Sequence, residues 1–139
     1  CWIKRADTSG DDWFWGNTNY NVNGGWAFHI TTGNTLQCRF MTYNISGPVL
    51  ADTAWHHIAA VRNGNYITIY KDGIGSGGSV SGAYSGNYGL TIGNLGPYYG
   101  PYTNARCTCW TDDLRITKGV ARYTSNFSND LPTEYFPTQ

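Results

Sequence analysis

The fold class is decided by one stretch of the sequence, WHHIAAVRNGNYITIYKDG at residues 55–73. Its two halves are rich in residues that favour β-strands, and the turn residues 63–65 separate them. In the second half Ile67 and Ile69 alternate with tyrosine and threonine, so the two isoleucines share one face of a strand. The stretch therefore predicts a β-hairpin in a two-faced sheet, as in a β-sandwich.

The rest of the 139 residues agrees with an all-β protein. Good helix formers are scarce, whereas the chain contains 18 glycines, 11 tyrosines and 6 tryptophans. Short strand-like runs bounded by turn residues recur along the sequence. We expect further strands at 1–5, 13–15, 25–30, 36–41, 88–93 and 109–117, a turn at 47–48 and a Gly/Ser-rich surface loop at 75–86.

The charge balance excludes two classes of partner. Nine Lys and Arg residues offset nine Asp and Glu residues, so the formal net charge is zero. A neutral chain has no overall field that would attract nucleic acid. No apolar run approaches the ~20 residues that cross a bilayer. We therefore expect neither nucleic-acid binding nor membrane insertion.

Three stretches together resemble a known family. They are 55–73, LTIG at 90–93 and DDLRITKGVARY at 112–123, and CWIKR at 1–5 matches the family's early strand. In this order they resemble laminin G-like, concanavalin A-like jelly-roll domains, above all copies in bacteriophage structural proteins and bacterial surface proteins. The resemblance implies a jelly-roll sandwich of two antiparallel sheets, located extracellularly, on a cell surface or on a virion. It also implies binding of a glycan or other cell-surface ligand.

The chain departs from the family at its start, because family members carry a further strand before the one at 1–5. We therefore expect a single domain over residues 1–139 that is short of its N-terminal strand. An uncovered sheet edge pairs readily with another chain, and near-zero net charge favours association. The alternative function is a structural subunit of a fibre, tail appendage or capsid decoration, assembled through strand-edge contacts with copies of itself or neighbouring chains.

Glycoside hydrolysis is the outsider, since some enzymes share the fold. Their paired carboxylates must face one groove. Here the single glutamate, Glu134, lies in the tail, and Asp112 and Asp113 are adjacent, so on a strand they point to opposite faces. The sequence also lacks a Gly-x-Ser-x-Gly nucleophile motif. We predict no catalytic residues and no enzymatic activity.

Glycan binding is the main functional prediction, because sugars stack on exposed aromatic rings. A Gly/Pro-rich loop carries three tyrosines, and two tryptophans precede an Asn-rich segment. The predicted glycan-binding residues are Tyr98, Tyr99, Tyr102, Trp13 and Trp15. The competing interpretation is that the tryptophans pack in the core or between the sheets. This interpretation applies to Trp26, Trp55, Trp110 and either Trp13 or Trp15.

No cofactor is required by this function, but calcium is a candidate. The resemblance implies a calcium site at the sandwich rim, and Asp and Asn oxygens suit this hard cation. The candidate ligands are Asp112, Asp113, Asn94 and Asp72. The competing interpretation is that Asp72 belongs to a turn and the adjacent aspartates end a strand.

The four cysteines, Cys1, Cys38, Cys107 and Cys109, allow three pairings. We expect at least one disulfide between strands, which would indicate an oxidising compartment. The alternative is four free thiols, as in a virion protein assembled in a cytosol. Asn44 and Asn126 each begin an Asn-x-Ser motif and are candidate glycosylation sites if the chain is a secreted eukaryotic one.

Overall fold

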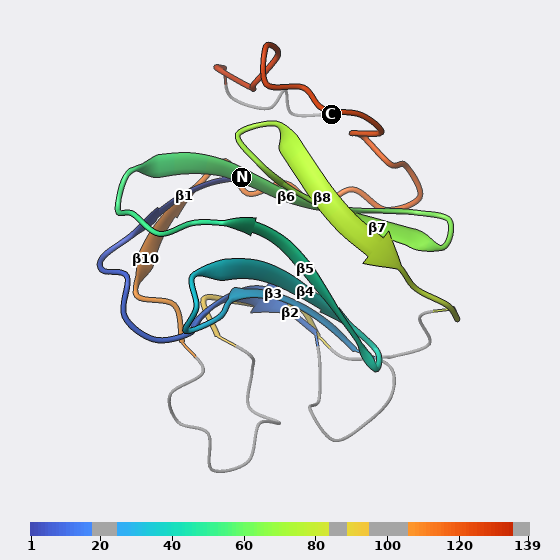
Figure 1. Cartoon of the computed structure of the whole chain (residues 1–139), viewed down its shortest axis with the longest axis horizontal. Coiled ribbons are helices and arrows are strands. Elements are labelled where there is room, and N and C mark those ends of the chain that lie inside the picture. The colour runs from blue at the N-terminus through green and yellow to red at the C-terminus, as the bar shows by residue number, and fades with distance from the viewer. Residues whose placement is uncertain (18–24, 84–88, 95–105, 135–139) are drawn as a thin grey trace.

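A computed structural model describes residues 1–17, 25–83, 89–94 and 106–134 of the chain. Within these residues it contains strands and no helix (Figure 1). The strands form two five-stranded antiparallel sheets that pack face to face as a sandwich. The all-β fold class, with two antiparallel sheets, is confirmed.

The first sheet has the strand order β10-β1-β6-β7-β8. Its strands are β1 (Trp2–Arg5), β6 (Trp55–Asn63), β7 (Tyr66–Lys71), β8 (Ile74–Ser79) and β10 (Cys109–Asp112). The second sheet has the order β5-β4-β3-β2-β9. Its strands are β2 (Asp12–Gly16), β3 (Trp26–Ile30), β4 (Thr35–Phe40), β5 (Tyr43–Val49) and β9 (Thr91–Ile92).

The predicted hairpin is confirmed as β6 and β7, which pair from Ile58↔Lys71 to Asn63↔Tyr66. Gly64 occupies the turn with φ +57°, a conformation that glycine adopts without strain. Ile67 and Ile69 are buried in the core between the sheets. The two faces of β7 therefore differ as the alternation predicts.

The core consists of the inner faces of both sheets. The side chains that are fully covered include Ile3, Phe28, Ile30, Leu36, Ile58 and Ile69. Burying each such side chain contributes about 1.5–3 kcal/mol relative to leaving it exposed. This shared apolar layer holds the two sheets against each other.

Three strand predictions need correction. Residues 75–79, expected in a loop, belong to β8, in which Gly77 lets two backbones approach: a Cβ there would lie 1.9 Å from the carbonyl oxygen of Ile67. Residues 47–48, expected in a turn, lie inside β5, an edge strand in which Pro48 is tolerated. The last strand, β10, is also shorter than expected, because it ends at Asp112.

The chain after β10 crosses the outer side of the first sheet (Figure 1). We call residues 123–130 the strap. The stacked rings of Tyr123 and Phe127, with centroids 3.8 Å apart, pack against His57 and Tyr70 on this face. The N–H of Phe127 donates to the carbonyl of Gly73 at 2.9 Å, which ties the strap to the β7–β8 turn.

Candidate functional site

Strands β10, β1 and β6 place one row of three side chains on the outer face of the first sheet. Lys4 lies opposite Trp110 on one side and Trp55 on the other, and directly opposed residues share a face. Trp55 is 46% exposed and Trp110 is 56% exposed. Neighbouring strands lie about 4.8 Å apart, so the two indoles are separated by roughly 10 Å. We call Trp55, Lys4 and Trp110 the tryptophan row.

The ammonium of Lys4 lies 5.8 Å from the ring centroid of Trp110, a cation–π contact. Such contacts contribute about 0.5–1 kcal/mol at exposed sites. The row therefore combines two apolar ring surfaces with a hydrogen-bond donor between them.

A groove of about 410 Å³ adjoins the row. The indole N–H of Trp2 donates to the carbonyl of Pro132 at 3.2 Å, and this contact draws the tail beside the sheet. The groove is lined by Trp2, Trp55, Asp112, Asp113 and 132–134. It therefore brings three carboxylates, one of them from the single glutamate of the chain, next to the exposed tryptophans.

The packing interpretation of Trp55 and Trp110 is wrong, because both side chains face solvent. The alternation of side chains along β6 predicts the outward position of Trp55. Ile58 points into the core, so Trp55, three residues earlier on β6, points outward. Trp110 lies opposite Lys4 on the same outward row.

The structure also corrects the expectation for Trp15. A register shift in the β2–β3 pair at Phe14 lets both Phe14 and Trp15 turn inward. Trp15 is 8% exposed and packs against Phe28, with ring centroids 5.4 Å apart. Trp13 is half-buried, and its ring stacks on His29 at 3.9 Å, so one face of its indole is covered.

Tyr98, Tyr99 and Tyr102 lie outside the described residues, and their role in glycan binding stays a prediction.

The predicted calcium ligands are not brought together. Asp72 lies in the β7–β8 turn, Asn94 bridges to Arg106 beside the second sheet, Asp112 ends β10 and Asp113 follows it. Over the described ranges, no three His, Cys, Asp or Glu side chains gather in a metal-binding arrangement. Calcium binding stays a prediction.

His56 lies between two carboxylates near the β7–β8 turn. Its Nδ1 lies 2.6 Å from Asp72 Oδ2, and its Nε2 lies 2.9 Å from Asp52 Oδ1. Hydrogen bonds from Ala54 N–H and His56 lower the pKa of the Asp52 carboxyl. Carboxylates therefore lie against both ring nitrogens of His56. The cluster stabilises the turn, and Asp52 was not a residue that the sequence singled out.

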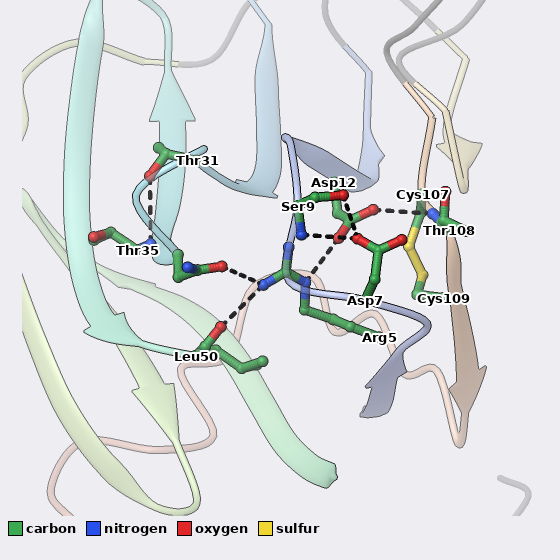
Figure 2. Close-up of polar contacts among 11 residues, drawn as sticks. Arg5, Asp7, Ser9, Asp12, Thr31, Thr35, Leu50, Cys107, Thr108 and Cys109 are labelled. Carbon is green, nitrogen blue, oxygen red and sulfur yellow. Dashed lines mark hydrogen bonds and ion pairs between the residues drawn. A yellow bond between two sulfur atoms is a disulfide. The ribbon is translucent and has the colours of Figure 1, made fainter. Parts of the chain in front are cut away.

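A buried ion pair joins the two sheets at one end of the sandwich (Figure 2). The Nε of Arg5, on β1, donates to Asp12 Oδ2, on β2, at 2.8 Å. One Nη of the same guanidinium donates to Asn34 Oδ1 at 2.6 Å and to the carbonyl of Leu50 at 3.1 Å. Asp12 Oδ1 accepts the N–H of Thr108 at 3.0 Å. The pair links elements of both sheets and is buried.

The stability of the fold should fall as the pH falls from about 6.5 to about 4. Burial lowers the pKa of both His29 and His57 from 6.5 to about 4. Over this range the unfolded chain therefore binds more protons than the folded chain, and the folded state loses stability. Urea unfolding at pH 7 and pH 5 measures the loss. The matched variant His57→Gln should show a shallower pH dependence, and an unchanged slope would contradict this assignment.

Two cysteines form a disulfide and two do not. Cys107 and Cys109 are bonded with one residue between them, just before and at the start of β10, so this bridge does not join two strands. Cys1 and Cys38 are buried free thiols, and burial raises the pKa of Cys38 to about 12. A thiol with so high a pKa is unreactive at neutral pH.

The two candidate glycosylation asparagines differ in their surroundings. Asn44 is exposed on the edge strand β5. The side-chain oxygen of Asn126 accepts the N–H of Gly75 at 3.0 Å and so holds the strap against β8. Asn44 is therefore the better placed of the two to carry a glycan, which stays a prediction.

The two five-stranded antiparallel sheets, packed face to face, define a β-sandwich domain. Residues 1–120 match a laminin G family model described as the concanavalin A-like lectin/glucanases superfamily, and the chain belongs to this family. The predicted resemblance is confirmed. Comparison with curated proteins and with solved structures found no match. In the described part of the chain, no helix is long and apolar enough to cross a membrane.

Proposed function

We propose that the chain is a non-catalytic carbohydrate-binding module that contacts its ligand through the tryptophan row. The observation that carries this proposal is the exposure of Trp55 and Trp110 on one sheet face, with Lys4 between them. The apolar faces of sugar rings pack on indoles, since aromatic rings supply large apolar contact areas with a polar edge. Hydroxyl groups at the edge of the sugar would meet Lys4 and the carboxylates of the adjoining groove.

The arrangement of carboxylates supports binding rather than hydrolysis. Asp112 and Asp113 are adjacent, and Asp112 Oδ1 accepts the N–H of Asp113 at 2.9 Å. Paired hydrolytic carboxylates instead face each other across the scissile bond. The Cys107–Cys109 disulfide and the laminin G family favour an extracellular location.

The test is binding to a panel of soluble polysaccharides, measured by affinity electrophoresis and then by calorimetry. Trp55→Ala and Trp110→Ala should each lower the affinity at least about tenfold, because tryptophans buried in an interface are common hot spots. The matched control is Tyr66→Ala, since Tyr66 is 45% exposed on the same face of the sheet, at the end of β7 away from the row. This control should bind as the parent protein does.

Two results would contradict the proposal. The parent protein binding no polysaccharide of the panel would reject carbohydrate recognition. Binding that survives both tryptophan substitutions would move the site elsewhere, and a variant with Tyr98, Tyr99 and Tyr102 replaced by alanine then tests the loop. Repeating the measurement with EDTA tests the calcium prediction on the same samples.

A further inference from the structure

The tryptophan row crosses three neighbouring strands at right angles to their direction. Trp110, Lys4 and Trp55 occupy opposed positions on β10, β1 and β6, and the bonds of an antiparallel ladder run perpendicular to its strands. The row therefore has one side chain for each strand and an indole at each end. A ligand that contacts both indoles must reach across two strand spacings, roughly 10 Å.

Both ends of the row are open in the described part of the chain. Strand β10 is an edge strand, so no described strand lies beyond Trp110. The ladder between β6 and β7 begins only at Ile58, so no described strand flanks Trp55 on the side away from β1. Beside the row, the same outward face continues with the small, exposed side chains of Ala6 and Thr108. A linear ligand that lies along the row can therefore continue past both of its ends.

The charges around the row indicate a neutral ligand. The adjoining groove carries the carboxylates of Asp112, Asp113 and Glu134. The row itself carries one ammonium group, that of Lys4, which already contacts the ring of Trp110. A polysaccharide with uronic acid or sulfate groups would bring like charges against the three carboxylates, which is unfavourable. A glycan without charged groups meets no such repulsion.

A chain of β-1,4-linked pyranoses has the repeat that the row requires. One sugar ring with its glycosidic oxygen advances such a chain by about one strand spacing. The chain is an extended ribbon in which successive rings are turned over, so every second ring presents the same face on the same side. Two alternate rings can therefore stack on the two indoles. Chains with α-1,4 or β-1,3 links coil, and their alternate rings turn away from a straight row.

We propose that the tryptophan row binds an internal stretch of a neutral, β-1,4-linked polysaccharide that lies across β10, β1 and β6. Alternate sugar rings stack on Trp110 and Trp55, and hydroxyl groups of the ring between them accept hydrogen bonds from Lys4. Three consecutive sugars are therefore the shortest ligand that contacts both indoles. This inference rests on the function proposed above and names the class of ligand that the same site takes.

The length of the ligand tests the spacing of the two indoles. Calorimetry with the full 139-residue chain measures binding of β-1,4-linked oligomers of glucose, mannose and N-acetylglucosamine. A disaccharide covers one indole at a time and a trisaccharide covers both, so the affinity should rise at least about tenfold between the two lengths. Trp55→Ala and Trp110→Ala should each remove this gain. Tyr66→Ala should keep it, because Tyr66 lies at the end of β7 away from the row.

Matched glycans test the linkage and the charge. The best of the three β-1,4-linked hexasaccharides should bind at least about tenfold more tightly than α-1,4- or β-1,3-linked glucose hexasaccharides, which cannot span both indoles. Hydroxyethyl cellulose and carboxymethyl cellulose share one β-1,4-linked backbone. The neutral polymer should bind more tightly at low salt, because the carboxylates of the groove repel the carboxymethyl groups. Asp112→Asn combined with Asp113→Asn should narrow this difference.

The outcomes separate this inference from the proposed function. If an α-1,4- or β-1,3-linked glycan binds as tightly as the β-1,4-linked ones, and both tryptophan variants lose that binding, the ligand class is wrong and the proposed function stands. Equal affinities for disaccharides, trisaccharides and hexasaccharides would overturn the contact with two indoles. Tighter binding of the anionic polymer would overturn the neutral ligand. If no glycan binds, both proposals are rejected.

Discussion

Replacing Asp12 with alanine is expected to lower the free energy of unfolding by about 3–5 kcal/mol, because it leaves a buried guanidinium without its counter-charge. Arg5 is 0% exposed, and its Nε bonds to Asp12 at 2.8 Å. One Nη atom already lacks a hydrogen-bond partner among the described residues, so no spare acceptor is at hand. The substitution also removes the acceptor for the N–H of Thr108. Both sheets therefore lose a shared contact.

Urea unfolding at pH 7, followed by tryptophan fluorescence, measures this loss. Asp7→Ala is the matched control, because Asp7 is exposed and, among the described residues, its carboxylate accepts hydrogen bonds from Ser9 alone. The control should change stability by no more than about 0.5 kcal/mol. Equal costs for the two substitutions would contradict the role of the ion pair. If Asp12→Ala does not fold, the double variant Arg5→Met with Asp12→Leu should fold, since apolar replacements of both partners often restore stability.

Local periodicity predicted the central hairpin because its second strand alternates regularly between the two faces of the sheet. Ile67 and Ile69 alternate with polar or aromatic neighbours, and a glycine with positive φ closes the turn. The same rule, applied to β6 from Ile58, predicts an outward Trp55. The exposure of Trp55 could therefore be predicted from the sequence, whereas that of Trp110 depends on its pairing with Lys4.

Other features depend on contacts between distant parts of the chain. Strand β8 could not be predicted from the sequence, because its glycines are typical of a loop. The glycine at position 77 is needed because a Cβ there would meet the backbone of Ile67. The inward turn of Trp15 depends on a bulge at Phe14, which shifts the alternation by one residue. The Arg5–Asp12 pair joins different sheets, and nothing in the spacing of the two residues distinguishes it from a solvated turn.

Replacing Gly73 with alanine is expected to lower the free energy of unfolding by about 2–4 kcal/mol, adding overpacking to backbone strain. Gly73 has φ +76°. A Cβ there would lie 2.4 Å from the nitrogen of Ser128 and 2.6 Å from the carbonyl carbon of Phe127. These are backbone atoms of the strap, so relief requires the strap to move. Urea unfolding measures the stability, and hydrogen exchange at Phe127 measures release of the strap.

The variant Gly119→Ala separates the effect of backbone strain from the effect of displacing the strap. Gly119 has φ +86°, and apart from its two chain neighbours no atom of the described residues lies within 4 Å of the position of its Cβ, so this control carries strain of about 1–2 kcal/mol and no clash. Faster exchange at Phe127 in Gly73→Ala, but not in Gly119→Ala, is the expected pattern, and equal exchange would contradict it.

The strap leads directly to Pro132, whose carbonyl accepts the indole N–H of Trp2 beside the tryptophan row. Release of the strap should therefore also weaken polysaccharide binding, because it frees the tail that places Glu134 in the groove.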